Sequence, residues 1–150
     1  MNEGRLVSIA RRNGKRAPME SLDSTRITGE AGVVGDFRGR PGKRQVTVLA
    51  SEDWQAACSD IGRTLPWTAR RANLLIEGVA LPRQAGKRLI IGDVVLEITG
   101  ELDPCSRMDE ASEGLREALV PDWRGGVTCR VLAGGDVGIG DAVRVEDADG

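Results

Sequence analysis

Short apolar runs separated by glycine-containing turns dominate the pattern of hydrophobic and polar positions along the chain. The runs are rich in Val, Ile and Leu, which favour the half-buried surface of a β-sheet. Runs of this length, interrupted by glycine, are typical of a barrel or sandwich of short strands. The pattern predicts strands at 6–10, 45–50, 73–77, 88–91, 94–99, 127–132 and 142–146.

Two segments show apolar residues at helical spacing instead. The first covers residues 51–61, and we expect Ser51 to cap its start. The second covers residues 107–119, with Ser106 and Asp109 as a capping-box-like start. The apolar stripes expected to face the core are Trp54, Ala57, Cys58 and Ile61 in the first helix, and Met108, Ala111, Leu115 and Leu119 in the second.

A glycine-rich and basic segment at 29–42 shows no clear period, so we expect a long loop there. Loops of this length in compact domains are often functional. Asp36, directly after Gly35, is expected to form a turn. No linker divides the chain, and 150 residues is a common size for one domain, so we expect a single domain over residues 1–150.

The composition is that of an ordinary folded protein, with 40% apolar and 29% charged residues. No apolar run approaches the roughly 20 residues of a membrane-spanning helix, and no apolar signal region follows Met1. The net charge is −2 with both signs mixed, which argues against a general nucleic-acid binder. We therefore expect a cytoplasmic protein with neither a nucleic acid nor a membrane as partner.

The sequence contains no histidine. This excludes Ser-His-Asp and Cys-His nucleophile pairs and every metal site that needs an imidazole ligand. The three cysteines form no C-x-x-C pair, and an odd number without a signal peptide argues against a disulfide framework. Any thiol chemistry must activate its sulfur by other means.

The three cysteines occupy different kinds of position. Cys58 falls on the apolar face of the first predicted helix and Cys129 in phase with the apolar residues of a strand, so both are expected to be core residues. Cys105 follows Pro104 in a loop before the second helix, with Arg107 two residues on. A helix N-terminus and a nearby cation both favour the thiolate, while neighbouring aspartates oppose it. Cys105 is therefore the best candidate for a reactive centre.

The order of several short motifs resembles the MOSC domain family, the family of the molybdenum cofactor sulfurase C-terminal domain. Each motif is weak by itself, but the ordered series covers nearly the whole chain. The residues that carry the resemblance are Gly35-Asp36, Arg71-x-Asn73, Pro104-Cys105 ahead of a helix, and Gly134-Gly135. The resemblance implies a stand-alone member of the family with a mainly β fold, a mostly antiparallel β-barrel with two or more flanking helices.

The resemblance also implies a site for the molybdenum cofactor (molybdopterin). Cys105 matches the family cysteine, which carries sulfur as a persulfide or ligates molybdenum, and a soft thiolate suits both roles. Arg71 and Asn73 match the residues expected near the pterin phosphate and ring, although both could be solvated polar groups at a strand edge. Additional cations that could extend the anion site, or simply form a solvated loop, are Arg38, Lys43 and Arg44.

Three functions remain open at this point. The first is sulfur transfer through Cys105, with a cysteine desulfurase or another sulfur donor and a molybdoenzyme or another sulfur acceptor as partners. The second is a molybdenum-cofactor-dependent reductase of N-hydroxylated compounds, which would need an electron-transfer partner. The third is a non-catalytic module that binds a pterin or a protein. Some relatives carry a pyridoxal-phosphate sulfurase extension that this chain lacks, so pyridoxal phosphate is not expected here.

We predict that Cys105 is the most reactive of the three thiols, because it is expected in a loop while Cys58 and Cys129 are expected in the core. Alkylation of the folded protein, followed by mass spectrometry of each cysteine peptide, measures the three rates. Faster labelling of Cys58 or Cys129 would overturn the assignment.

Overall fold

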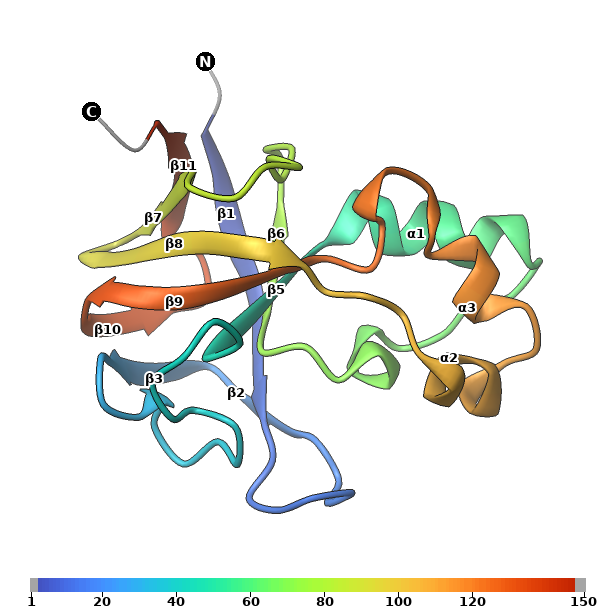
Figure 1. Ribbon diagram of the computed structural model, residues 1–150, viewed down its shortest axis with the longest axis horizontal. Helices are drawn as coiled ribbons and strands as arrows, with labels where there is room; N and C mark the ends of the chain where they lie inside the picture. The colour runs from blue at the N-terminus through green and yellow to red at the C-terminus, as the bar shows by residue number, and fades with distance from the viewer. Residues whose placement is uncertain (1–2, 148–150) are drawn as a thin grey trace.

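A β-barrel forms the body of the protein, as the computed structural model of residues 3–147 shows (Figure 1). The 8-stranded sheet runs in the order β11-β7-β8-β9-β5-β6-β1-β2 and closes because β11 also pairs with β1. Its pairings are antiparallel except for β5 with β6, which confirms the predicted fold class. The strands of the ring are β1 (Glu3–Arg11), β5 (Val46–Ala50), β6 (Leu74–Glu77), β7 (Arg88–Ile91), β8 (Val94–Glu101), β9 (Val127–Ala133) and β11 (Ala142–Glu146).

The parallel pair β5 and β6 is joined by a crossover that contains the helix α1 (Ser51–Asp60) and the 3₁₀ turn η1 (Trp67–Arg70). Parallel strands need such a crossover, and its helix covers their outer face. All five residues of β5 are accordingly buried. Its apolar residues face two different hydrophobic cores on opposite sides of the strand. Val48 belongs to the barrel core, whereas Leu49 belongs to the cluster beneath the helices.

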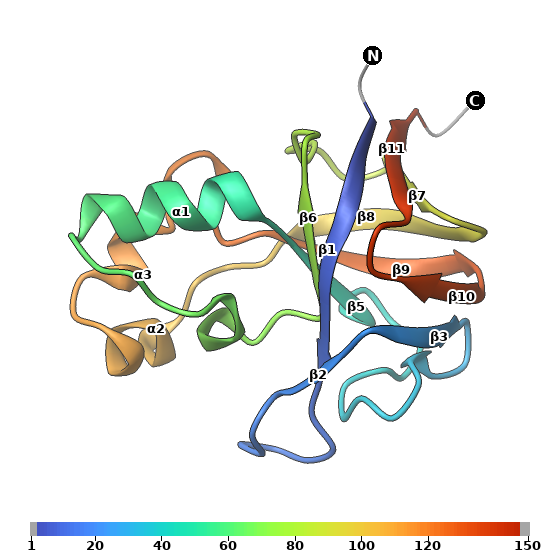
Figure 2. The same ribbon diagram turned by 180° about the vertical axis from the view of Figure 1, so that it is seen from behind.

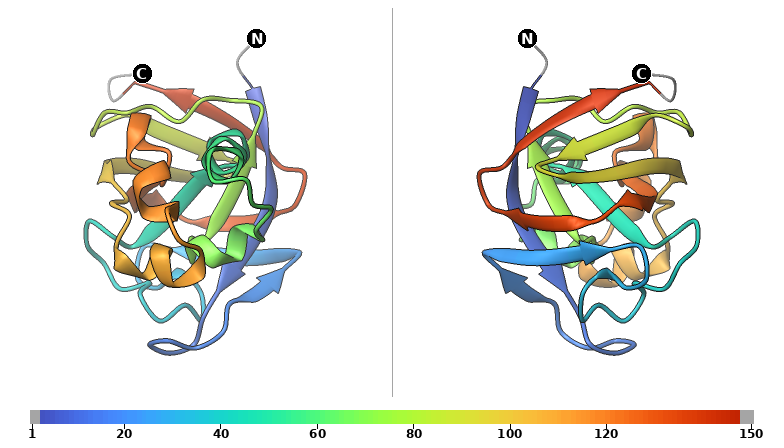
Figure 3. Two further views of the ribbon diagram at one scale, coloured as in Figure 1. Left: turned by 90° about the vertical axis from the view of Figure 1, so that its right-hand side faces the viewer. Right: turned by 90° about the vertical axis from the view of Figure 1, so that its left-hand side faces the viewer.

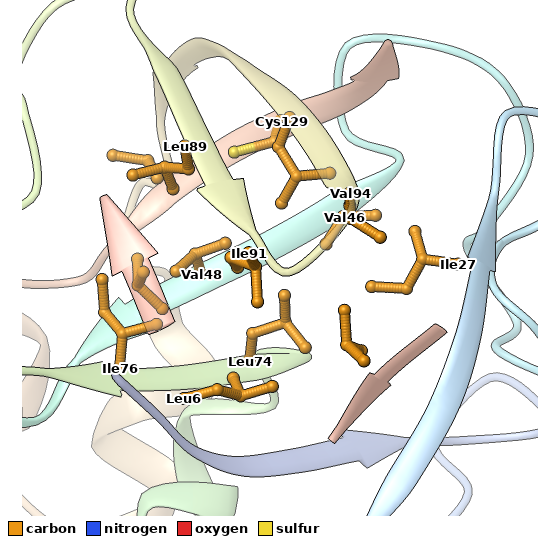
Figure 4. Close-up of a cluster of buried hydrophobic side chains, with 14 of the residues drawn as sticks. Leu6, Ile27, Val46, Val48, Leu74, Ile76, Leu89, Ile91, Val94 and Cys129 are labelled. Carbon is orange, nitrogen blue, oxygen red and sulfur yellow. The ribbon is translucent and has the colours of Figure 1, made fainter. Parts of the chain in front are cut away.

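Two hydrophobic cores therefore share this pair of strands. The first fills the barrel, where Leu6, Val48, Leu74 and Cys129 point inward (Figure 4). The second packs the helices against the outside of the barrel, on one side of the molecule (Figures 2 and 3). Its buried members are Leu49, Trp54, Ala57, Cys58, Ala72, Leu75, Leu102, Met108, Leu115 and Leu119.

Four short strands are present where the sequence analysis expected none. They are β2 (Glu20–Leu22), β3 (Ser24–Thr28), β4 (Gly32–Val33) and β10 (Gly135–Gly138). The last three form a small sheet in the order β10-β3-β4, which contributes Ile27, Val33 and Val137 to the barrel core. Part of the expected loop at 29–42 is therefore a strand, and its few apolar residues were too sparse to form a recognisable run.

The second predicted helix is wrong as a continuous element. It is two short helices, α2 (Ser106–Ala111) and α3 (Leu115–Ala118), because Ser112 is extended and Gly114 has a φ of 87°. Leu115 is buried as expected, but Ala111 is exposed.

The predicted caps also differ from the structure. Ser51 is the first helical residue, Ala50 is the N-cap, and the Ser51 hydroxyl accepts a hydrogen bond from Gln55. At the second site Cys105 rather than Ser106 is the N-cap. Asp109 accepts a hydrogen bond from the backbone N–H of Arg116, and so links α2 to α3 rather than closing a capping box.

Within residues 3–147, no helix is both long enough and apolar enough to span a bilayer.

Gly126, at the start of β9, lies where two backbones approach closely. Its φ is 103°, and a Cβ atom there would lie 2.3 Å from the carbonyl oxygen of Val48. Its own carbonyl accepts a hydrogen bond from Leu102, 2.9 Å away, at the beginning of the segment that leads to Cys105. This glycine therefore ties that segment to the barrel.

We predict that Gly126→Ala lowers the free energy of unfolding by about 3 kcal/mol, because it adds a backbone clash to the strain of a positive φ. Gly62→Ala is the matched control, since Gly62 has a φ of 65° and a Cβ atom there would have no neighbouring atom within 4 Å. The control should lose about 1 kcal/mol, the strain of the left-handed conformation by itself. Urea denaturation measures both losses, and equal values would contradict the proposed close approach.

Candidate functional site

Cys105 is the one exposed cysteine of the three in the sequence, whereas Cys58 and Cys129 are buried as expected. It is the N-cap of α2, with extended backbone angles, and its carbonyl accepts a hydrogen bond from the N–H of Met108 at 2.9 Å. This first-turn N–H thus binds the Cys105 backbone and not its sulfur. Burial raises the pKa of the thiols of Cys58 and Cys129, which keeps both protonated and inert.

Arg71 follows the η1 turn and has a left-handed backbone, with a φ of 65°. Its Nη2 donates a hydrogen bond to the carbonyl oxygen of Ala17, while its Nε is buried and has no partner among the described residues. Burial, and next to it the positive charge of Arg107, lowers the pKa of Arg71. A buried donor without an acceptor is costly, so this guanidinium has an unused hydrogen bond to offer an anion.

Asn73 is a buried link between three strands, only 5% exposed. Its Oδ1 accepts hydrogen bonds from the backbone N–H of Thr47 at 3.0 Å and from the Thr47 hydroxyl at 3.2 Å. Its Nδ2 donates to the carbonyl oxygen of Ala10 at 3.2 Å. The amide therefore joins β5 to the end of β1 at the start of β6, and one Nδ2 hydrogen remains for a ligand.

A small cavity brings most of the predicted site residues together. Its volume is about 20 Å³, enough for roughly one water molecule. An open groove of about 330 Å³ shares two of its arginines, Arg38 and Arg44, and continues along Arg40, Pro41 and Gly42. The residues that line the small cavity are Arg12, Asp36, Arg38, Arg44, Thr47, Arg71 and Asn73.

Lys43 lies outside both linings. Its backbone carbonyl accepts a hydrogen bond from the hydroxyl of Thr99, which ties the basic loop to β8. The Lys43 side chain is exposed. If Lys43 takes part in cofactor binding as predicted, it does so through its positive charge next to the groove, because its side chain does not line the cavity.

Cys105 does not line the small cavity, but it shares a neighbour with it. Partial burial lowers the pKa of Arg44, Arg38 lowers it further, and the negative forms of Cys105 and Asp103 act against both effects. Arg44 is therefore within electrostatic reach of Cys105 and at the same time part of the cavity wall. The thiol and the arginines consequently belong to one region of the surface.

The cations of this region lack carboxylate partners. Within residues 3–147, no carboxylate forms an ion pair with Arg12, Arg38, Arg44, Arg71 or Arg107. Asp36 uses its two carboxylate oxygens on the backbone N–H groups of Arg12 and Arg38, as expected for a turn-forming residue. Burial, and then repulsion by Arg71 and Arg38, lowers the pKa of Arg12. Such a concentration of unpaired guanidinium groups suits a phosphate or another anion.

Three residues of this region were not predicted as site residues. Arg12 and Thr47 line the small cavity, and Arg70 lies buried next to Arg71. The basic pairs Arg11-Arg12 and Arg70-Arg71 were a signal for two of them, because clustered cations can form a local anion site.

A more spacious cavity of about 510 Å³ lies elsewhere, between the start of α1 and the segment 78–83. It contains none of the predicted site residues. The candidate site is therefore chosen for the chemistry of its arginines and of the exposed thiol, and not for the size of its cavity.

A model of the MOSC domain family matches residues 24–144. The chain belongs to the MOSC domain family. The predicted family is thus confirmed, and membership supports a role connected with the molybdenum cofactor. A search among curated proteins finds no match to the sequence.

Solved structures show the same fold in other proteins. The YUAD protein from Bacillus subtilis is 18% identical, with a TM-score of 0.78 over 97% of this chain and 96% of its own. YiiM from Geobacillus stearothermophilus is 16% identical, with a TM-score of 0.75 over 95% of this chain and 74% of its own. YiiM from Escherichia coli is also 16% identical, with a TM-score of 0.68 over 94% and 69% of the two chains.

We predict that Asn73→Ala destabilises the fold by about 3 kcal/mol, because it leaves the buried N–H of Thr47 and carbonyl of Ala10 without their partner. Asn13→Ala, at an exposed asparagine, is the control and should change stability by about 0.5 kcal/mol or less. Thermal and urea denaturation measure both. If Asn73→Ala is as stable as the control, the hydrogen bonds of Asn73 to Thr47 and Ala10 are dispensable for folding, and ligand recognition is the main role of Asn73.

Proposed function

We propose that this protein is a sulfur-transfer domain connected with the molybdenum cofactor, and that Cys105 is its sulfur-carrying or metal-ligating residue. The observation that carries the proposal is the exposed thiol of Cys105 within electrostatic reach of Arg44, one of a group of arginines without carboxylate partners around the small cavity. A nucleophilic sulfur and an anion site on one surface are what a phosphate-bearing cofactor and a sulfur donor both require.

As a sulfur carrier, Cys105 would act as a nucleophile. Its thiolate attacks the terminal sulfur of a donor persulfide, the bond between the two donor sulfurs breaks, and the donor leaves as a thiolate. The product is a persulfide on Cys105, and sulfur is transferred without a net change of oxidation state. A cysteine desulfurase or another persulfide-bearing protein fits the donor role, and a molybdoenzyme or other sulfur acceptor fits the next step.

The arginines around the small cavity suit the phosphate of the cofactor in their chemistry, and the open groove that shares Arg38 and Arg44 has the room for it. The unused buried Nε of Arg71 offers a hydrogen bond, and Arg12, Arg38 and Arg44 add positive charge on the same wall. The remaining Nδ2 hydrogen of Asn73 could serve a pterin edge. When bound, the cofactor would supply molybdenum for redox or sulfur chemistry, and the soft sulfur of Cys105 is a suitable ligand.

Cys105 would be the main protein ligand of such a metal. No group of three or more His, Cys, Asp or Glu side chains gathers within the described residues. The cofactor would therefore bring the other ligands itself. The protein would supply the thiolate, the anchoring of the phosphate and the positive surface.

The decisive experiment compares the wild type with Cys105→Ala, Arg71→Ala and Arg63→Ala, all produced in a host that makes the cofactor. Arg63 is an exposed arginine just beyond the end of α1, and it serves as the control. We expect Arg71→Ala to weaken retention of the cofactor about tenfold to a hundredfold, the loss of a charged hydrogen bond of about 1.5–3 kcal/mol. Its stability should fall by about 1 kcal/mol or less, because it loses a single bond, to Ala17.

Two measurements on freshly purified protein then separate the functions. Incubation with a persulfide donor should increase the mass of the Cys105 peptide by one sulfur atom, and Cys105→Ala should take up none. Retained molybdenum and pterin without sulfur uptake would favour the reductase alternative. No sulfur uptake by the wild type, together with normal retention of molybdenum and pterin by Cys105→Ala, would leave a binding module as the explanation.

A further inference from the structure

Arg70 is a buried cation that the proposed function has not yet used. It ends the η1 turn and is 5% exposed. Its Nε donates a hydrogen bond to the carbonyl of Gly125 at 2.8 Å, and its Nη2 donates to the carbonyl of Leu102 at 2.6 Å. Its Nη1 lies 3.7 Å from the sulfur of Met108.

No carboxylate within the described part of the chain forms an ion pair with this guanidinium. A buried charge without a counter-ion is costly, and an apolar side chain of similar volume often stabilises a protein more. Burial lowers the pKa of Arg70 to about 10, so the group still carries its charge at neutral pH. A cation without an ion-pair partner is therefore kept at this place at a cost in stability.

The side-chain contacts of Arg70 fall on the segment that carries Cys105 and on the turn before β9. Leu102 and Met108 lie at the two ends of the segment 102–108, and Gly125 lies in the turn that leads into β9. The α2 helix also packs against the η1 turn, which contains Arg70 (Figure 1). One rigid side chain thus fixes both ends of the loop from beneath, while Cys105 in its middle is exposed.

The charge of Arg70 also reaches the thiol. Burial is the main influence on the pKa of Arg70, and the negative form of Cys105 is the leading one that opposes it, ahead of Asp103 and Glu101. Because the interior screens charge less than water does, a buried guanidinium acts at longer range than an exposed one. Cys105 therefore lies within electrostatic reach of both Arg70 and Arg44, and the carboxylates of Asp103 and Glu101 also lie within reach of Arg70.

We propose that Arg70 is a positioning residue for Cys105: it holds the segment 102–108 in place, and its unpaired charge selects anionic reactants at the exposed sulfur. This inference rests on the proposed function, and it specifies the class of reactant. Persulfide anions are preferred at the Cys105 thiolate, and acceptor thiolates at the Cys105 persulfide, over neutral compounds of the same size.

The test uses two alkylating reagents of similar size, the anion iodoacetate and the neutral iodoacetamide, in competition on the folded protein. The ratio of their rates at Cys105 reports the local potential, because any change in thiol reactivity affects both reagents alike. We expect Arg70→Gln to lower the ratio of iodoacetate to iodoacetamide about threefold, because it removes one positive charge within electrostatic reach of Cys105. Arg70→Lys keeps the charge and should keep the ratio.

Arg124→Gln is the matched control. Arg124 is also partly buried and donates to a backbone carbonyl, that of Ala118, but it pairs with Asp60 and has no hydrogen bond to segment 102–108. This variant should lose stability without changing the ratio at Cys105. A ratio that is unchanged in Arg70→Gln, with a lower melting temperature, would show that Arg70 is only structural.

A second measurement covers the case in which Arg70→Gln does not fold. Lysine cannot bind the carbonyls of Leu102 and Gly125 in a fixed fork, so hydrogen exchange in segment 102–108 should be faster in Arg70→Lys than in the wild type. Unchanged exchange there, or a lower alkylation ratio in Arg70→Lys, would overturn the inference. Sulfur uptake by wild-type Cys105 tests the proposed function separately, because it does not depend on this ratio.

Discussion

Hydrogen bonds between Asn73 and Thr47 hold together the two parallel strands on which both hydrophobic cores and the candidate site depend. They join β5 to β6 at the start of the parallel pair, and the link from Asn73 to Ala10 adds β1. On one side of these strands lies the barrel core, and on the other lies the core beneath the helices. Because β5 and β6 are shared by both cores, their relative position determines where η1, and with it Arg70 and Arg71, can lie.

The site is built from segments that leave this framework at its ends. Arg12 follows β1, Arg44 precedes β5, and Arg71 precedes β6. One arginine next to the end of each of these three strands therefore lines the same small cavity. The segment with Cys105 leaves β8 and passes over Arg70 on its way to the helices. A rigid barrel with irregular connections is a common way to place functional groups precisely.

Charge is distributed unevenly in this protein. Its net charge is −2, yet the arginines around the cavity and beneath Cys105 have no carboxylate partners in the described residues. Burial and mutual repulsion lower the pKa of several of them, which means that this arrangement costs the folded chain some stability. A bound anion would offset that cost, so the arginines themselves favour an anionic ligand such as a phosphate.

Local periodicity and the order of motifs were enough to predict the barrel strands, the first helix, the family and the contrast between Cys105 and the two core cysteines. They did not reveal β3, β4 and β10, whose polar sequences become strands by pairing with one another over the barrel core. Nor did they reveal that Asn73 is buried and links three strands by hydrogen bonds, or that Gly114 divides the second helix. Arg70 lies buried and binds the carbonyl of Leu102, while its neighbour Arg71 lines the cavity. This difference arises from tertiary packing, since adjacent arginines look alike in sequence and differ only in what surrounds them.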